Sequence, residues 1–241
     1  MNIQTPIDPA PPTEGGASRY RLDFDDYKFL WDACLHRVYG KTELLDGIIY
    51  GRPMTPADAE TRRHRITLPE YLLLWNGRLH AKPFKTELIN GTIYQMPADG
   101  PLTSRWNGAI NRWLQLSVTE DRVVKAEQTL FLGNEWAPDP DHYVFPADLD
   151  EEDVTGADIA LLIEVSVSTL SFDLTEKAAG YASSGIREYW VIDPNSKTLY
   201  AHRLGDDGTY GEPLEIGFTD TVTAQHIPGL RLRMAELPRI S

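Results

Sequence analysis

Glu164 is a carboxylate inside the most apolar segment of the chain, Ile-Ala-Leu-Leu-Ile-Glu-Val at residues 159–165. A carboxylate buried without a partner costs several kcal/mol, so this side chain must be paired, protonated or bound to a metal ion. Alternation along a strand places Leu162, Glu164 and Ser166 on one face. Residue type alone leaves a structural salt bridge and a metal site open.

Asp141 and Lys177 are the other two residues whose positions could serve chemistry. Asp141 ends the run Ala-Pro-Asp-Pro-Asp just before a predicted strand, although aspartates are also common in ordinary turns. Asp173 and Glu176 have the spacing of a helix N-cap and its capping glutamate, which places Lys177 near the helix start. The helix dipole opposes a cation there. The structural alternative is an Asp173–Lys177 pair at i, i+4, worth only about 0.3–0.5 kcal/mol.

Hydrolysis of a phosphodiester would use all three residues. Two carboxylates, here Asp141 and Glu164, can hold a hard divalent cation such as Mg²⁺ or Mn²⁺ through oxygen ligands. The ion lowers the pKa of a bound water and polarises the phosphoryl oxygen. A lysine such as Lys177 can orient or deprotonate that water, or meet the negative charge that develops on the phosphorus centre.

Strands and helices alternate around these residues. The apolar patterns predict helices at 104–117 and 173–184, and strands at 123–132, 142–145, 158–165, 188–193 and 199–204. This succession is typical of an α/β sheet with antiparallel additions. The predicted fold therefore brings the ends of neighbouring strands and one helix to the three candidate residues.

The N-terminal part has a different organisation. Residues 1–20 are rich in Pro, Gly and small polar residues, which predicts a disordered arm. Residues 21–54 then align without a gap with residues 65–98, and more than a third of the aligned positions are identical. Each copy predicts a short helix followed by a strand with a central turn. We interpret this as a local duplication, with 21–64 as the appended copy.

Composition limits the function. The chain of 241 residues carries a net charge of −13, which counts against a broad DNA-binding face. Its one cysteine, Cys34, excludes an internal disulfide and a thiolate zinc cage, which fits a reducing cytoplasm. Neither a signal peptide nor a membrane-spanning run is evident, so the sequence predicts a cytoplasmic protein without a membrane partner.

Three stretches together resemble a known family. They are ELINGTIYQMP at residues 87–97, PDPD at 138–141, and ALLIEVSVSTLSFDLTEKAAGYASSGIREYWVID at 160–193. The chain resembles the Uma-type (Uma-two) restriction endonuclease family of the PD-(D/E)XK nuclease superfamily across residues 65–235. The resemblance implies a mixed central sheet flanked by helices, with residues 65–241 as the nuclease-like domain. It also implies a Mg²⁺- or Mn²⁺-dependent endonuclease with DNA as substrate.

Residues carry over from the family by motif. Asp141 matches the aspartate of the PD element and Glu164 the acidic residue of the (D/E)XK element. Ser166 occupies the usual lysine position, and in this family the lysine is displaced to the following helix, here Lys177. Glu87 resembles an acidic residue that the family places near the site. The resemblance thus implies catalytic roles for all four, Asp141, Glu164, Lys177 and Glu87, with Asp141 and Glu164 as metal ligands.

One departure leaves the activity open. Family members often have a histidine in a Pro-x-x-x-His context, where this chain has Arg105 and Trp106. Glu43 repeats Glu87 in the first copy but without the accompanying set, so we expect no second active site there. The alternatives are a nuclease-fold module acting in protein or nucleic-acid interaction, and another phosphodiesterase-like hydrolase. A homodimer is expected by analogy, because cutting a duplex takes two sites.

Overall fold

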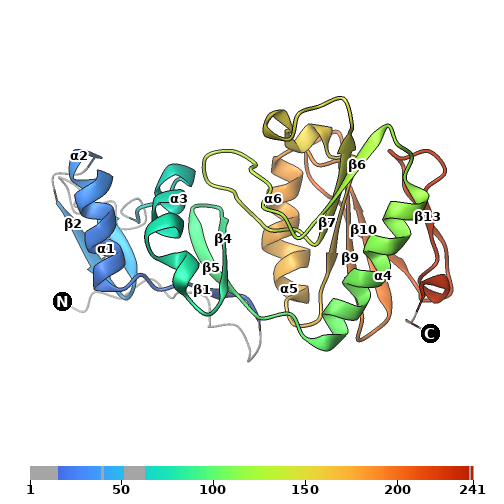
Figure 1. The fold of residues 1–241 in the computed structure, drawn as a ribbon, viewed down its shortest axis with the longest axis horizontal. Helices are drawn as coiled ribbons and strands as arrows, with labels where there is room; N and C mark the ends of the chain where they lie inside the picture. The colour runs from blue at the N-terminus through green and yellow to red at the C-terminus, as the bar shows by residue number, and fades with distance from the viewer. Residues whose placement is uncertain (1–15, 39–40, 52–62, 239, 241) are drawn as a thin grey trace.

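The computed structural model describes residues 16–38, 41–51, 63–238 and 240, so most of the predicted disordered arm lies outside the described residues. A smaller N-terminal part and a larger core follow each other along the longest axis of the molecule (Figure 1). No helix of the described residues is both long and apolar enough to span a membrane.

A six-stranded mixed sheet forms the centre of the core, as the sequence predicted. Its spatial order is β11-β10-β9-β8-β7-β6, in which only the β8–β9 pair is parallel. The strands are β6 (Arg122–Ala126), β7 (His142–Pro146), β8 (Leu161–Val165), β9 (Glu188–Asp193), β10 (Thr198–Arg203) and β11 (Leu214–Ile216).

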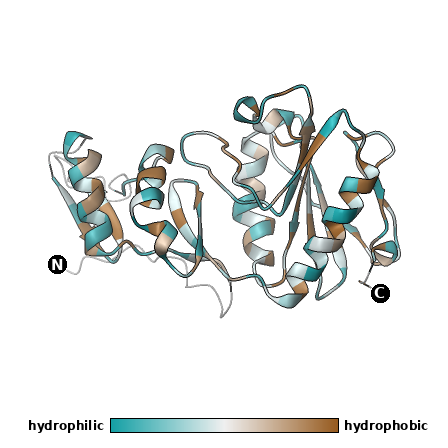
Figure 2. Ribbon diagram, viewed as in Figure 1, coloured by the Kyte–Doolittle hydropathy of each residue, from teal (hydrophilic) through white to brown (hydrophobic). Residues whose placement is uncertain are grey.

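Helices cover both faces of this sheet (Figure 1). Helix α4 (Pro101–Ser117) packs with Leu161 and Ile163, whereas the helical segment α5 (Leu170–Phe172), η6 (Asp173–Lys177) and α6 (Ala178–Ser183) packs against the face that carries Leu162. Hydrophobic residues dominate the central strands, while α4 and α6 are banded with polar residues (Figure 2). Strand alternation turns Glu164, like Leu162, toward α6.

Short elements complete the core. A β12–β13 hairpin and a terminal 3-10 turn close the α4 side, and two further 3-10 turns precede β8. Their bounds are η4 (Glu151–Asp153), η5 (Gly156–Asp158), β12 (Val222–Thr223), β13 (Arg231–Leu232) and η7 (Met234–Glu236).

Two similar helix–hairpin units make up the N-terminal part. The first contains α1 (Phe24–Leu30), η1 (Trp31–Leu35), α2 (His36–Val38), β2 (Thr42–Leu45) and β3 (Ile48–Gly51). The second contains α3 (Leu68–Gly77), η3 (Leu79–Ala81), β4 (Lys85–Ile89) and β5 (Thr92–Met96). A short strand β1 (Ser18–Arg19) precedes the first unit but pairs with β5 of the second.

Equivalent residues make equivalent contacts in the two units. The hydroxyl of Tyr27 donates to the carbonyl oxygen of Thr42, and that of Tyr71 donates to the carbonyl of Thr86. Both hairpins turn through a residue with positive φ followed by glycine, at Asp46 (50°) and Asn90 (51°). The units also share one hydrophobic core. That one unit arose by copying the other, and that a domain boundary separates them, stay predictions.

Two predicted strand boundaries are wrong by three residues or more. The predicted strand at 123–132 ends at Ala126, because Glu127 adopts a left-handed conformation with φ 50° that breaks the extended backbone. The strand predicted at 158–165 begins only at Leu161, since the side chain of Asp158 accepts from the backbone and hydroxyl of Thr155 in a capped 3-10 turn. Both corrections lie in chain segments that lead into the candidate site.

Candidate active site

Four segments bring acidic side chains close to one lysine, at the C-terminal end of the central strand β8. Glu87 comes from β4, Asp141 from the turn before β7, Glu164 from β8, and Asp173 shares the π-helical turn η6 with Lys177. A small cavity of about 80 Å³ is lined by all five. The four site residues that the sequence singled out therefore lie together in the structure, although none of their roles follows from position alone.

Glu164 is fully engaged by its neighbours. Its Oε1 accepts hydrogen bonds from Lys177 Nζ at 3.0 Å and from the Tyr181 hydroxyl at 2.9 Å, and its Oε2 accepts from the backbone N–H of Asp141 at 3.2 Å. The residue is only 5% exposed. The buried carboxylate is thus paired, and its second oxygen is held beside the other predicted metal ligand.

Lys177 is the only cation in contact with these carboxylates among the described residues. Its Nζ lies 3.1 Å from Glu87 Oε2 and 3.9 Å from Asp173 Oδ1, in addition to Glu164. Burial lowers the pKa of the ammonium, but the charges of Glu164, Glu87 and Asp173 outweigh burial and raise that pKa well above its usual value. Lys177 is therefore a permanent cation at neutral pH in this environment.

The helix start predicted at Asp173 is wrong. The helix begins at Leu170 after Thr169, whose hydroxyl donates to Asp173 Oδ2 at 2.6 Å. Asp173 is therefore turned inward, toward Thr169 and Lys177, instead of capping a helix. Lys177 lies about two turns beyond the start, where the dipole of the N-terminus has little effect. Its position is explained by the carboxylates and not by the helix end.

Asp141 is held by one backbone and one side-chain donor. Its Oδ2 accepts from the Val165 N–H at 2.6 Å, and its Oδ1 accepts from Asn107 Nδ2 at 2.7 Å. Burial and the nearby charge of Glu164 raise the pKa of Asp141 well above 3.8 despite these donors. The two carboxylates therefore fix each other's position. Glu164 accepts the backbone N–H of Asp141, and Asp141 accepts the backbone N–H of Val165, the residue after Glu164.

Glu87 joins the cluster from the N-terminal part. Its Oε1 accepts from Lys177 at 3.3 Å, while Oε2, although close to the same nitrogen, has no hydrogen bond of good geometry. Burial raises the pKa of Glu87 from 4.5 to about 8, and burial also raises the pKa of Asp173 from 3.8 to about 6. Between about pH 5 and 6, Glu87 and Asp173 therefore keep protons that exposed carboxylates would have lost.

The donor chemistry fits a hard divalent cation. Carboxylate oxygens outnumber the single ammonium, and burial together with the charge of Glu164 raises the pKa of Glu87 and of Asp141. Within the described ranges, no group of three or more His, Cys, Asp or Glu side chains is placed so that it could hold a metal ion. Mg²⁺ does not require one, since it commonly uses one or two carboxylates with water and substrate phosphate. Asp141 and Glu164 would be those two ligands.

Comparison with known proteins places the chain in a family. The family model described as "Uma2: Putative restriction endonuclease" matches residues 68–235. The chain belongs to the Uma2 family. A crystal structure titled as that of a putative nuclease of DUF820 from Anabaena variabilis is similar in fold, with a TM-score of 0.53. The two are 19% identical, over 70% of this chain and 96% of the other. No curated protein matches the chain.

Sequence inspection of this Uma2 chain missed two contributors to the site. Asn107 holds Asp141, and it lies on α4 where the family histidine was sought; Arg105 is exposed and Trp106 is buried in the core. Asp139, the first aspartate of PDPD, also lines the cavity, and burial raises its pKa. The doubled Pro-Asp could have drawn attention to Asp139, but a single amide within a helix gives no such signal.

Two further residues of the segment 160–193 lie in or beside the site. Tyr181, a fully buried residue of α6, donates its hydroxyl hydrogen to Glu164 Oε1 at 2.9 Å. Ser166, in the usual lysine position, is buried with its hydroxyl 3.1 Å from that of Thr169. The ammonium at the cavity comes from Lys177 in η6, since Ser166 after β8 has none. That Lys177 takes the role of the usual strand lysine stays a prediction for this Uma2 member.

Proposed function

We propose that the protein is a Mg²⁺- or Mn²⁺-dependent endonuclease that hydrolyses phosphodiester bonds in DNA. Membership of a family described as restriction endonucleases supports the reaction class. The observation that carries the proposal is the convergence of Lys177, Glu164 and Asp141, joined by hydrogen bonds of 3.0 and 3.2 Å at one cavity. Separated carboxylates could not share an ion, and these two are adjacent.

Asp141 and Glu164 would hold the cation, which when bound supplies Lewis-acid polarisation of the phosphate and a more acidic water. The side chains around them have distinct tasks. The Asn107 amide fixes the Asp141 carboxylate, and the Tyr181 hydroxyl fixes Glu164. Burial raises the pKa of Tyr181 well above 10, so its hydroxyl stays a donor. Both carboxylates are thus oriented before substrate arrives.

Lys177 would act as a cation and not as a base. Its raised pKa keeps it protonated at neutral pH, so it donates hydrogen bonds to an attacking water or to the phosphoryl oxygen as negative charge develops. Glu87, with a pKa of about 8, is the group that can take or release a proton near neutral pH. This division assigns charge stabilisation to the lysine and proton exchange to a glutamate.

The alternative is a nuclease-fold module that binds protein or nucleic acid without cutting. The net charge of −13 and the replacement of the family histidine by Arg105 and Trp106 favour it. Cutting both strands of a duplex would also require two copies of the site, so a homodimer stays a prediction, as does a cytoplasmic location. Activity measurements separate the two functions.

Nicking of supercoiled plasmid with Mg²⁺ or Mn²⁺ tests the proposal. Wild-type protein should convert plasmid to open circles, and EDTA should abolish the conversion. Asp141→Asn should lower the rate by at least about a hundredfold, because it removes a ligand charge. Asp121→Asn, at an exposed acid remote from the cavity, is the matched control. Nicking that persists unchanged in Asp141→Asn would come from a contaminant and would leave the interaction module as the better function.

A further inference from the structure

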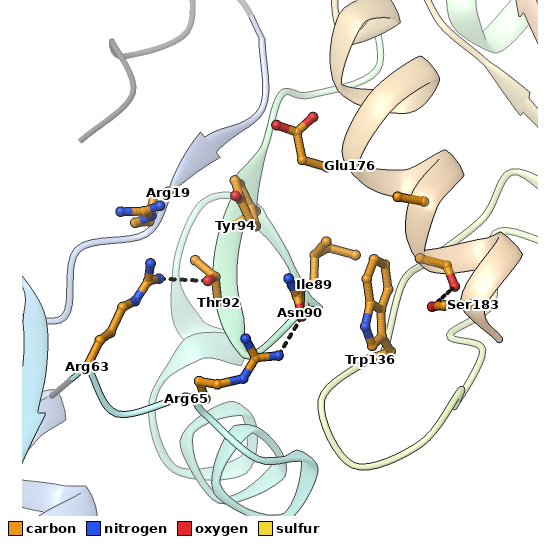
Figure 3. Close-up of a pocket in the computed structure, with 12 residues that line it drawn as sticks. Arg19, Arg63, Arg65, Ile89, Asn90, Thr92, Tyr94, Trp136, Glu176 and Ser183 are labelled. Atoms are coloured by element: carbon orange, nitrogen blue, oxygen red, sulfur yellow. Dashed lines mark hydrogen bonds between the residues drawn. The ribbon is translucent and has the colours of Figure 1, made fainter. Parts of the chain in front are cut away.

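A second, larger cavity lies beside the catalytic cluster. It has a volume of about 490 Å³, within the range of pockets that hold small ligands, and contains Arg19, Arg63 and Arg65 in its lining (Figure 3). Glu176 is the one acidic residue among the side chains that line it. Three arginines thus line one cavity in a chain whose net charge is −13. We call this cavity the arginine pocket.

Two of the arginines, Arg63 and Arg65, are held in place by hydrogen bonds to polar neighbours. Arg63 Nη2 donates to the Thr92 hydroxyl at 2.6 Å, and Arg65 Nη2 donates to Asn90 Oδ1 at 2.5 Å. Figure 3 shows both guanidinium groups directed toward the β4–β5 hairpin. Arg65 also pairs with Glu135, which offsets part of its charge. Planar guanidinium groups fixed in this way suit bidentate contacts with phosphate.

The opposite wall is aromatic and unusually close to the helix. Trp136 stands against α6 (Figure 3), at a position where a Cβ on Gly180 would fall 1.7 Å from the indole ring. Tyr94 lines the same cavity and packs against Phe172 with ring centroids 4.7 Å apart. Aromatic rings beside fixed arginines are the combination that binds single-stranded nucleic acid, through base stacking and phosphate contacts.

The same sheet face and the same helical segment contribute residues to the arginine pocket and to the catalytic cluster of Glu87, Asp141, Glu164, Asp173 and Lys177. In the β1-β5-β4 sheet, Arg19 is opposite Tyr94, and Tyr94 is opposite Glu87. Residues directly opposite in antiparallel strands lie on one face, so a single sheet face supplies Glu87 to the cluster and Arg19 to the pocket. Helix residues do the same, since Lys177 faces the cluster and the neighbouring Glu176 lines the pocket.

We propose that the arginine pocket binds a nucleotide of the substrate strand next to the scissile phosphodiester. Its phosphate would contact Arg63 and Arg65, and its base would lie against Trp136. This inference rests on the proposed nuclease function, since it takes the ligand to be nucleic acid. It also gives an acidic protein a defined place to contact a polyanion, because three arginine side chains line a cavity beside the catalytic cluster.

Binding measured without cleavage tests the arginine pocket. Full-length wild-type protein in EDTA is titrated into a short fluorescein-labelled single-stranded DNA, and anisotropy gives the affinity. Arg63→Gln and Arg65→Gln should each weaken binding by about tenfold, the effect of losing one charged hydrogen bond. The slope of log affinity against log salt should fall by about 0.7 for each lost phosphate contact. Arg231→Gln, an exposed arginine on β13, is the matched control and should change neither quantity.

Thermal unfolding of each variant separates binding from folding. Arg63→Lys keeps the charge but not the planar guanidinium, so it should bind more tightly than Arg63→Gln and more weakly than wild type. Unchanged binding in both glutamine variants alongside metal-dependent nicking by wild type would overturn the arginine pocket and leave the nuclease function standing. Arginine-dependent binding with no nicking would uphold the pocket and reject the activity. Binding of free mononucleotide but not of the oligonucleotide would overturn the inference, because the pocket would then serve a separate ligand.

Discussion

Lys177 Nζ lies 3.0 Å from Glu164 Oε1, and both side chains are almost completely buried. The pair links helix and strand across a separation of 13 residues, from η6 to β8. Glu87 and Asp173 also lie within 4 Å of Lys177 Nζ, so one ammonium contacts three carboxylates. Such a cluster is a poor device for stability alone, because buried ion pairs recover little more than their desolvation. The burial of this cluster at a cavity therefore supports the proposed catalytic role.

Removing the ammonium should destabilise the protein strongly. Lys177→Met leaves Glu164 and its neighbours buried without a counter-charge, and we expect a loss of about 3–5 kcal/mol in the free energy of unfolding. Glu87→Gln should cost less in Lys177→Met than in wild type, since the contact between Lys177 and Glu87 at 3.1 Å is already lost there. Urea denaturation of the two single variants and the double variant measures the coupling. Strictly additive effects would show that Glu87 and Lys177 do not interact.

Asn107 should act through Asp141 as a positioning residue. Asn107→Leu removes the donor to Asp141 Oδ1 at nearly the same volume, and loss of such a supporting contact typically lowers metal affinity or activity by about 10–100-fold. The Mg²⁺ concentration needed for half-maximal nicking should therefore rise. Asn111→Leu, one turn further along α4, is the control and should leave the Mg²⁺ dependence unchanged. An equal effect of both substitutions would indicate a general disturbance of α4.

The sequence singled out residues that lie together at one cavity because their signals are local, while their catalytic roles stay a prediction. Glu164 interrupts a run of apolar residues that had to be a buried strand, and Asp141 stands at the turn before another. Asn107 gave no such signal, since its role depends on how α4 packs over the sheet. The helix start was misplaced because Asp173 has the residue type of a cap, whereas its carboxylate is bound inside by Thr169 and Lys177.

The arginine pocket could not have been predicted from sequence spacing. Arg19, Arg63 and Trp136 come from three distant segments, which meet only because β1 adds to β5 and the loop before β7 crosses α6. The strand predicted at 123–132 would have extended β6 past Ala126, into residues that instead begin the loop that carries Trp136. The left-handed turn at Glu127 instead releases the chain to reach the helix.

Titration of Glu87 should make stability depend on pH. Burial raises the pKa of Glu87 from 4.5 to about 8, so the folded protein holds this proton more tightly than the unfolded chain does. The resulting stabilisation is complete below about pH 4 and is lost as the pH rises through about 8, with a slope of up to about 1.4 kcal/mol per pH unit. Glu87→Gln should flatten this slope between about pH 5 and 8 in metal-free urea denaturation. Glu212→Gln, an exposed substitution, should follow wild type. Parallel curves for wild type and Glu87→Gln would show that Glu87 ionises normally.

Gly180 should be required for the close approach of Trp136 to α6. In Gly180→Ala the new Cβ would meet the indole at 1.7 Å, so the ring must move, and overpacking of this kind costs about 1–3 kcal/mol. Gly108→Ala is a matched control in the interior of α4, because no atom lies within 4 Å of the place its new Cβ would take, and it should stabilise by about 0.5–1 kcal/mol. Thermal or urea unfolding gives both values. Oligonucleotide binding should weaken in Gly180→Ala and not in Gly108→Ala, since only the first moves a wall of the arginine pocket. A stabilising Gly180→Ala with unchanged binding would show that Trp136 is free to leave the helix and forms no fixed wall.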